Sequence, residues 1–228
     1  MSRQPRIAVL LDENTSVDGS RYDTNKGYFV AVRRAGGSPF GIPYLADMVE
    51  EIVDDFHGFV AVGGRFAYPD GWYVNGTASP YPSSERLPVE RALMEGFLAR
   101  DKPVLGICAG MQMLACLHGC RLTPDVRTLG PGIREHDKRG VLHSVAIAPG
   151  SMLAGIAGES LEVNSFHREA VAQTSDGVLA SARSSDGVIE AIEVPSRRFA
   201  VGLQWHQEQL AADHDGSRIF RAFVDACR

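Results

Sequence analysis

A cysteine at the end of an apolar run is the residue best placed for covalent chemistry. The run Pro103–Cys108 predicts a buried strand, and Cys108 closes it within Gly106-Ile-Cys108-Ala-Gly110. Glycines on both sides relieve crowding where a strand turns sharply into a helix, as in a nucleophile elbow. The positive end of that helix favours the thiolate, and the Ala109 amide would face an oxyanion formed at an attacked carbonyl. A core cysteine is the alternative, and the paired glycines favour the nucleophile.

A cysteine nucleophile needs a base and a group that orients the base. The segment Gln204-Trp-His206-Gln-Glu208 supplies both directly after the predicted strand Phe199–Trp205. A spacing of two lets the carboxylate fold back toward the imidazole once the chain leaves the sheet. Taken alone, His-x-Glu is typical of a solvated surface pair. Its combination with Cys108 predicts a catalytic triad of Cys108, His206 and Glu208.

The elements that must position these residues alternate between strand and helix in the first half of the chain, which predicts a mostly parallel central sheet flanked by helices. In the second half, Ser175-Asp-Gly and Ser185-Asp-Gly each precede a strand, and Asp-Gly favours tight turns, so we expect antiparallel hairpins there. The fold class is therefore α/β. The predicted strands are Arg6–Asp12, Phe59–Gly64, Pro103–Cys108, His143–Ala148, Leu161–His167, Val178–Arg183, Val188–Val194 and Phe199–Trp205; the predicted helices are Thr24–Ala35, Ala46–Asp55, Pro88–Arg100 and Gly110–His118.

The composition excludes several classes of protein. A chain of 228 residues with 44% hydrophobic and 22% charged residues is globular, and we expect one domain over residues 1–228. No apolar run approaches the ~20 residues that span a bilayer. A net charge of −5 disfavours nucleic acid or an anionic membrane as partner. Four cysteines and no recognisable signal peptide predict a reducing, cytoplasmic location.

Taken together, the motifs resemble the class I glutamine amidotransferase-like superfamily, and within it the gamma-glutamyl hydrolase branch, peptidase family C26. The resemblance covers nearly the whole chain and includes gamma-glutamyl-gamma-aminobutyrate hydrolases. It implies a flavodoxin-like fold, no cofactor, and hydrolysis of a gamma-glutamyl amide with Cys108 as nucleophile. Its motifs are Val62-Gly63-Gly64, Gly106-Ile-Cys108-Ala-Gly110-Met-Gln112, Val163-Asn-Ser-Phe-His167, Ser185-Asp-Gly-Val-Ile-Glu190 and Gln204-Trp-His206-Gln-Glu208.

The resemblance also implies further site residues. The amides of Gly64 and Ala109 would form the oxyanion hole, and Gln112 matches a position that helps to hold the glutamyl group. The remaining substrate-binding residues expected from the matched motifs are Gly63, Phe66, Asn164, Ser165 and His167.

Departures from the family pattern bear on the substrate. Ala109 stands where relatives carry arginine or another large residue, and Phe66 and Leu87 occupy positions that are usually acidic. The usual paired histidines are reduced to His167 followed by Arg168. These changes predict a roomier, more apolar leaving-group pocket that prefers neutral, apolar or aromatic amines over gamma-aminobutyrate.

Other polar residues have simpler interpretations. Cys116 and Cys120 lie one helical turn apart, with His118 between them in the sequence, and no second cluster completes four ligands, so we predict no metal site there. His143 opens a strand and is either structural or part of the pocket. Glu190, in an apolar strand, is interpreted as a buried structural partner. No phosphate-binding loop with a following lysine supports nucleotide binding.

Three functions remain open at this point. The first is a hydrolase whose only required partner is a small gamma-glutamyl amide, with a homodimer as one expected assembly. The second is a glutaminase subunit that delivers ammonia to a synthetase. The third is a non-catalytic ligand-binding relative, which the residues at positions 66, 87 and 109 leave open.

Overall fold

A computed structural model describes residues 4–13, 20–214 and 216–228. Its central feature is a nine-stranded sheet in the order β4-β1-β5-β6-β13-β12-β11-β8-β9. The five strands from β4 to β13 are parallel neighbours, as predicted, and they bring their carboxyl ends to one edge. These strands are β4 (Ser38–Ile42), β1 (Arg6–Leu10), β5 (Gly58–Ala61), β6 (Val104–Ile107) and β13 (Ala200–Leu203).

The remaining four strands of this sheet are antiparallel, which confirms the expected change of architecture in the second half. The Asp186-Gly187 turn joins two of them as a hairpin, with Gly187 at φ +90°. The Asp176-Gly177 turn differs from the prediction, because the strand before it pairs with β7 (Arg121–Thr123) in a separate ladder. The antiparallel strands are β12 (Ile189–Glu193), β11 (Leu179–Ser184), β8 (Val141–Ile147) and β9 (Ser160–Ser165), and the strand paired with β7 is β10 (Ala170–Gln173).

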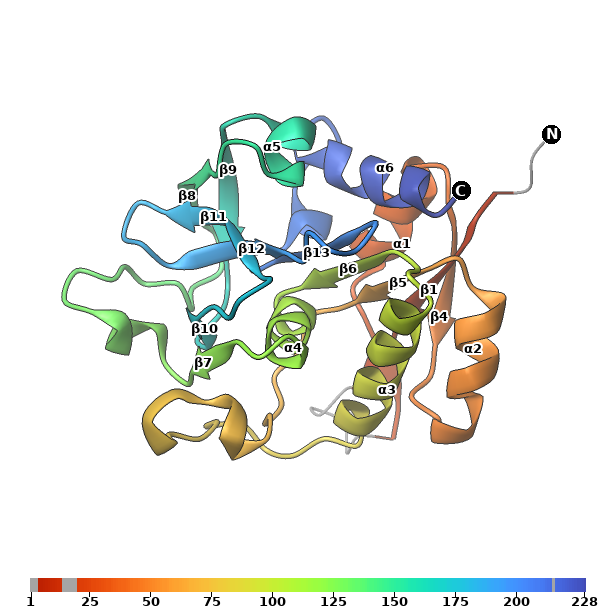
Figure 1. The fold of residues 1–228 in the computed structure, drawn as a ribbon, viewed down its shortest axis with the longest axis horizontal. Coiled ribbons are helices and arrows are strands. Elements are labelled where there is room, and N and C mark those ends of the chain that lie inside the picture. The colour runs from red at the N-terminus through yellow and green to blue at the C-terminus, as the bar shows by residue number, and fades with distance from the viewer. Residues whose placement is uncertain (1–3, 14–19, 215) are drawn as a thin grey trace.

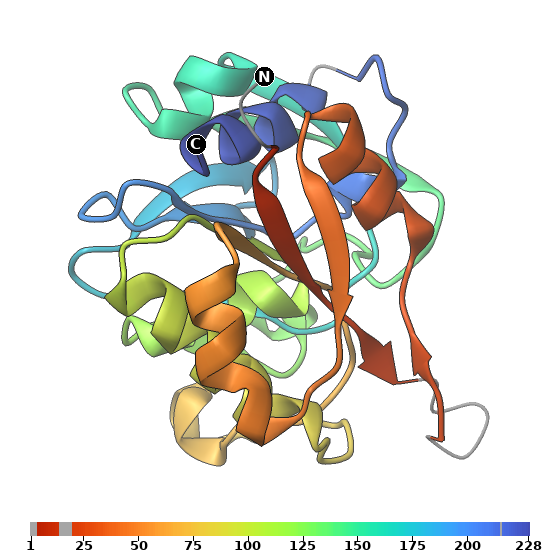
Figure 2. The ribbon, with the colours of Figure 1, turned by 90° about the vertical axis from the view of Figure 1, so that its right-hand side faces the viewer.

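Helices cover both faces of the sheet (Figure 1). One face carries α2 (Val49–Asp55), α3 (Arg86–Ala99) and α4 (Ala109–Leu117), and the other carries α1 (Lys26–Arg34), α5 (Met152–Ala157) and α6 (Ser217–Ala226). The view in Figure 2 shows the twisted parallel strands between these two layers.

Alternation along the strands supplies both layers of the core. On β1, Ala8 and Leu10 pack into one hydrophobic cluster, whereas Ile7 and Val9 pack into the other. Because successive side chains of a strand point to opposite faces, a strand buried on both sides is a continuous apolar run. This is why short apolar runs located β1, β5, β6 and β13 in the sequence, whereas the partly exposed edge strand β4 gave no such run.

Several elements of the structure have no counterpart among those predicted from the sequence. They are β4, β7, β10, α5 and the C-terminal helix α6, which packs against α1 and α5. The long Tyr68–Ser84 loop contains two short 3-10 turns, at Asp70–Trp72 and Val74–Gly76. The other short elements are the β2 (Asp12–Glu13) and β3 (Tyr22–Asp23) ladder and 3-10 turns at Ala46–Met48, Val126–Leu129 and Gln207–Gln209. Within the described residues, no helix has the length and apolar composition needed to cross a membrane.

Candidate active site

Cys108 occupies a strained turn between β6 and α4. Its backbone has φ +53° and ψ −105°, a conformation that residues other than glycine rarely adopt. The turn requires close packing on both sides. A Cβ on Gly110 would lie 2.2 Å from the Ala61 carbonyl oxygen, and one on Gly106 would lie 2.4 Å from the Gly110 oxygen. Strain that the surrounding structure maintains is typical of functional sites, and here it holds the thiol at the end of a central strand.

His206 and Glu208 lie beside this thiol, because β13 pairs with β6 in parallel and ends at the same edge of the sheet. The Nδ1 atom of His206 is 2.8 Å from Glu208 Oε1, so the imidazole presents Nε2 to the cysteine. Burial alone would lower the pKa of His206, but hydrogen bonds with Cys108 and Glu208, together with their charges, raise it to about 10. The imidazole is therefore favoured as an imidazolium, which can donate a proton to a departing amine.

Gly63 and Gly64 follow β5 and are held by the buried Arg86. Its guanidinium donates to the carbonyl oxygens of Gly63 at 2.9 Å and Val62 at 2.6 Å, and it pairs with Glu90 at 2.8 Å. The loop is thus fixed by charge-assisted hydrogen bonds from a side chain that is 0% exposed.

The two predicted oxyanion donors lie on the segments that flank the thiol. Gly64 lines the cavity described below, and Ala109 is the first residue of α4, where backbone amides have no intrahelical acceptor. The amide of Gly63 is already engaged, since it donates to the Tyr28 hydroxyl at 3.0 Å. Gly64 and Ala109 consequently remain the expected backbone donors of the oxyanion hole.

A cavity of about 330 Å³ opens above the thiol. It brings together the triad and four of the predicted substrate-binding residues. Its lining consists of Asp12, Thr24, Asn25, Tyr28, Gly63, Gly64, Arg65, Phe66, Tyr81, Cys108, Gln112, Arg139, Phe166, His167, Arg168, Glu169, His206, Glu208 and Gln209.

Asn164 and Ser165 lie outside this lining, contrary to the expectation that they contact substrate. The Asn164 side chain accepts a hydrogen bond from the His206 amide at 2.8 Å and donates to the His206 carbonyl at 2.9 Å. Ser165 instead donates to the His136 carbonyl at 2.9 Å. Alternation along β9 points these neighbours to different sides. Asn164 therefore holds the backbone at His206 in place.

The cavity as a whole is more charged than the apolar leaving-group pocket expected from the sequence. Three arginines line the cavity, and two of them, Arg65 and Arg139, stack on Phe166 with guanidinium carbons 4.4 and 4.6 Å from the ring centroid. Ala109 is not part of the lining, because its backbone is buried under Tyr68, whose hydroxyl donates to the Ala109 oxygen at 2.7 Å. Positive charge comes from loop residues rather than from the position after the cysteine.

Glu169 is a cavity residue that the sequence analysis missed. Burial raises the pKa of its carboxyl to about 7, although hydrogen bonds from Ser79 and Tyr73 act in the opposite direction. Its carbonyl accepts from Gln112 Nε2 at 3.0 Å, which fixes the amide that the resemblance assigned to the glutamyl group. The charged pair Arg168-Glu169, which lies between two strands, was the sequence signal that could have identified Glu169 as a site residue.

Comparisons with known proteins identify the family of the chain. The sequence profile of the peptidase C26 family matches residues 7–208. A Mycobacterium tuberculosis protein, named as a candidate glutamine amidotransferase, is 36% identical over 207 residues; the alignment covers 87% of this chain and 66% of that protein, just under two thirds of its length.

Two further likenesses extend over nearly the whole chain. The gamma-glutamyl-gamma-aminobutyrate hydrolase of Escherichia coli strain K12 is 28% identical, with 98% of this chain and 94% of that protein covered. The crystal structure of a glutamine amidotransferase from Thermotoga maritima superposes with a TM-score of 0.64 at 18% identity, covering 98% of this chain and 84% of that one. At that identity the structure supports the fold alone.

Proposed function

The chain belongs to the peptidase C26 family, and we propose that it hydrolyses the amide bond of a gamma-glutamyl amide through a gamma-glutamyl thioester on Cys108. The family and its named relatives support an amide hydrolase or amidotransferase type of activity. One observation carries the finer assignment: a strained Cys108 at the helix terminus is hydrogen-bonded to a histidine that Glu208 orients.

The proposed acylation step uses each member of this arrangement. The Cys108 thiolate forms an S–C bond with the gamma-carbonyl carbon, and the carbonyl π electrons move onto its oxygen. The amides of Gly64 and Ala109 stabilise this oxyanion. When the intermediate collapses, the C–N bond breaks and His206 gives its proton to the amine nitrogen, which leaves as a neutral amine.

Deacylation returns the enzyme to its starting state. His206, now neutral, takes a proton from water as the water oxygen bonds to the thioester carbon. Collapse of this second intermediate breaks the C–S bond and releases glutamate and the Cys108 thiolate beside the imidazolium. The reaction consumes one water and needs no redox partner.

The charges of the cavity suit a glutamyl group, which carries an alpha-carboxylate and an alpha-ammonium. Arg65, Arg139 and Arg168 offer positive charge, while Asp12 and Glu169 offer carboxylates. A cavity lined by one sign of charge would reject one end of this zwitterion. Mixed charge around the thiol therefore supports an amino-acid-like substrate over an uncharged amide.

The glutaminase alternative is supported by the relative named as a candidate glutamine amidotransferase. A glutaminase and a gamma-glutamyl hydrolase share the triad and differ in the amine that leaves, which is ammonia in one and a larger amine in the other. Turnover by the isolated chain discriminates between them, because a docking glutaminase requires its synthetase partner for full activity.

A turnover screen tests the proposal. The purified chain is incubated with glutamine and with a panel of gamma-glutamyl amides, and mass spectrometry detects free glutamate and the released amine. We expect partner-free release of both products from at least one larger amide, at a rate above that with glutamine. Labelling of Cys108 by a gamma-glutamyl electrophile without turnover of any panel member would instead indicate a non-catalytic binding protein.

A further inference from the structure

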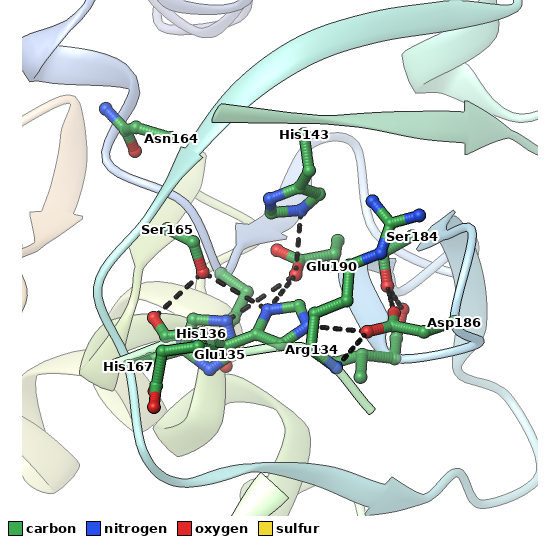
Figure 3. A network of polar contacts seen from close by, with 12 residues as sticks. Arg134, Glu135, His136, His143, Asn164, Ser165, His167, Ser184, Asp186 and Glu190 are labelled. Atoms are coloured by element: carbon green, nitrogen blue, oxygen red, sulfur yellow. Dashed lines mark hydrogen bonds and ion pairs between the residues drawn. The ribbon is translucent and has the colours of Figure 1, made fainter. Parts of the chain in front are cut away.

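A second buried cluster lies in the antiparallel half of the sheet, around Glu190 on β12. Three imidazole nitrogens converge on a single atom, Glu190 Oε1: His136 Nδ1 at 3.2 Å, His143 Nε2 at 3.2 Å and His167 Nε2 at 3.5 Å (Figure 3). All four side chains are at most 4% exposed. The mechanism proposed above uses none of these contacts.

The hydrogen bonds on the far side of two rings establish which nitrogens carry hydrogen. His167 Nδ1 is 3.0 Å from the Glu169 carbonyl oxygen, an acceptor, so this nitrogen donates. His136 Nε2 is 3.0 Å from an Asp186 carboxylate oxygen and donates as well. In a neutral imidazole the other nitrogen then carries a lone pair and no hydrogen. The His167 nitrogen that faces the glutamate is therefore an acceptor.

Other neighbours do not supply the missing hydrogen. The Ser165 hydroxyl donates to the His136 carbonyl oxygen at 2.9 Å, so its oxygen accepts from His136 Nδ1 at 3.1 Å, and that hydrogen is not aligned with Glu190. Among the described residues, His143 Nε2, His167 Nε2 and both Glu190 carboxylate oxygens have no hydrogen-bond partner. A buried carboxylate that receives no aligned hydrogen bond is unstable unless positive charge lies beside it. The cluster thus requires a cation, either protons or a metal ion.

The spacing of the atoms favours a metal ion. Zinc binds imidazole and carboxylate at about 2.0–2.2 Å, which places neighbouring ligands of a tetrahedral site about 3.4 Å apart. The three contacts with Glu190 Oε1 lie within 0.2 Å of that separation. Ligand atoms of His136, His143 and Glu190 all lie within 4.8 Å of one another, the only such group found among the described residues.

The surroundings of the cluster also match a metal centre. Metal-ligating histidines usually donate their second nitrogen to a carboxylate or a carbonyl, which fixes the tautomer and the ring orientation. Asp186 does this for His136, and the Glu169 carbonyl does it for His167. Asp186 is itself held by the Arg134 amide at 2.9 Å.

We propose that His136, His143 and Glu190 form a structural site for a divalent transition-metal ion, with His167, 3.5 Å from Glu190 Oε1 but outside the group of mutually close ligand atoms, as its fourth ligand. Zn²⁺ matches this imidazole-rich set best. The inference does not rest on the reaction of Cys108. It differs from the expectation drawn from the sequence, which looked for metal ligands only among Cys116, His118 and Cys120.

The site would stabilise one wall of the cavity. His136 lies in the segment 130–140, which has no helix or strand, whereas His143 and Glu190 lie on β8 and β12. The same segment carries Arg139, which lines the cavity, and Asp137, which forms an ion pair with Arg65. A bound ion would fasten this segment to the sheet.

Metal titration of the full chain tests the proposal. Chelator-treated protein is titrated with Co²⁺ and with Zn²⁺, and binding is followed by visible absorption, elemental analysis and thermal unfolding. We expect one equivalent with the visible spectrum of four-coordinate Co²⁺ and no sulfur-to-cobalt charge transfer, and a higher unfolding temperature with metal. The Cys108→Ala variant should bind equally, which separates this site from the triad.

Variants locate the ligands. Glu190→Gln and His143→Gln should each abolish stoichiometric binding, and Asp186→Asn should weaken it roughly 10–100-fold by releasing the orientation of His136. His118→Gln serves as the control, because it removes a histidine from the Cys116–Cys120 region and should leave binding unchanged. Circular dichroism verifies that each variant is folded.

Two results would overturn the proposal: a folded parent protein that binds neither ion, or a Glu190→Gln variant that binds as the parent does. If the Glu190→Gln variant does not fold, NMR spectra of the histidine rings of the parent protein test the site instead. Zn²⁺ should shift the ring resonances of His136, His143 and His167, whereas a shift confined to His206 would place the metal at the triad and refute the site.

Discussion

Two buried clusters place histidine beside glutamate, and they differ in how their hydrogen bonds are satisfied. At the edge of the parallel strands, His206 and Glu208 form an aligned 2.8 Å hydrogen bond, and the imidazole also bonds to a thiol that lines an open cavity. In the antiparallel half, Glu190 is 3.2–3.5 Å from three imidazoles, is 0% exposed, and has no aligned donor.

The difference shows that residue type alone does not assign a role. A histidine with one acceptor on Nδ1 and a nucleophile near Nε2 can move a proton between two defined atoms. A group of imidazoles around one carboxylate that receives no aligned hydrogen bond is not arranged for such a transfer, and it is instead suited to holding a cation. The positions of the hydrogens distinguish a catalytic relay from a ligand set.

The largest effect on turnover is expected from a variant at the Cys108–His206–Glu208 cluster that leaves the cluster around Glu190 unchanged. Cys108→Ala should lower kcat by about 10⁶-fold, as removal of a covalent nucleophile does in comparable triads, while metal binding and thermal stability remain at parental values. Turnover and cobalt binding are measured on the same preparation. Near-parental turnover by this variant would remove Cys108 from the mechanism.

A smaller loss is expected from Glu208→Gln, which leaves the base in place and removes the group that orients it. We predict a decrease of kcat of about 10⁴-fold, against about 10⁶-fold for His206→Asn. Equal and negligible losses in both variants would move the base to another residue, with His167 the next candidate in the cavity.

The pH profile of the parent and of Glu208→Gln sharpens this prediction. Because the folded pKa of His206 is about 10, the imidazolium persists through neutral pH and kcat/KM should fall only as the pH approaches 10. The stability that His206 contributes is likewise complete below its unfolded pKa of about 6.5 and is lost as the pH rises toward 10. Removing the carboxylate should shift the alkaline limb to lower pH; an unshifted limb would contradict the assigned role.

Arg86 provides a third cluster in which buried charge is fully paired. Arg86→Met should lower the free energy of unfolding by about 3–5 kcal/mol, because it leaves Glu90 as an uncompensated buried charge. The double variant Arg86→Met/Glu90→Leu should regain most of this stability in chemical denaturation. It should not regain turnover, because the Val62 and Gly63 carbonyls still lack their donor. If the double variant regained both stability and turnover, Arg86 would contribute to stability alone and not to the loop that turnover requires.

The smallest effect concerns the arginines of the cavity. Arg139→Gln should lower the preference for gamma-glutamyl-gamma-aminobutyrate over gamma-glutamyl butylamide roughly tenfold in kcat/KM, the loss typical of a hydrogen bond to a charged group. Arg91→Gln, on the exposed face of α3, is the matched control. A ratio that stays constant in both variants would support the apolar leaving group that the sequence predicted.

The sequence predicted what depends on local residue patterns. The strands of the parallel half, the turn at Cys108 and the His206–Glu208 spacing can be read from neighbouring residues, because glycines, apolar runs and turn chemistry act over short distances. The helix Ser217–Ala226 carried a readable signal as well, since Ile219, Phe220 and Phe223 are spaced on one helical face.

Features that depend on tertiary contact were not readable. The imidazoles around Glu190 come from a loop, from β8 and from the end of β9, so no spacing in the chain relates them. Arg139 lies in the segment 130–140 and lines the cavity, a contact that no local pattern in the chain predicts. The interpretation of Glu190 as a buried partner was drawn from its apolar strand, and the identity of its partners required the fold.

Direct detection of the acyl-enzyme tests the central claim. The parent chain is mixed with a gamma-glutamyl amide that it turns over, quenched in acid within the steady state, and analysed by intact-protein and peptide mass spectrometry. We predict a gamma-glutamyl adduct on the peptide that contains Cys108, removable by hydroxylamine and absent from Cys108→Ala. Sustained turnover with no adduct on Cys108, or an adduct on another residue, would contradict the account.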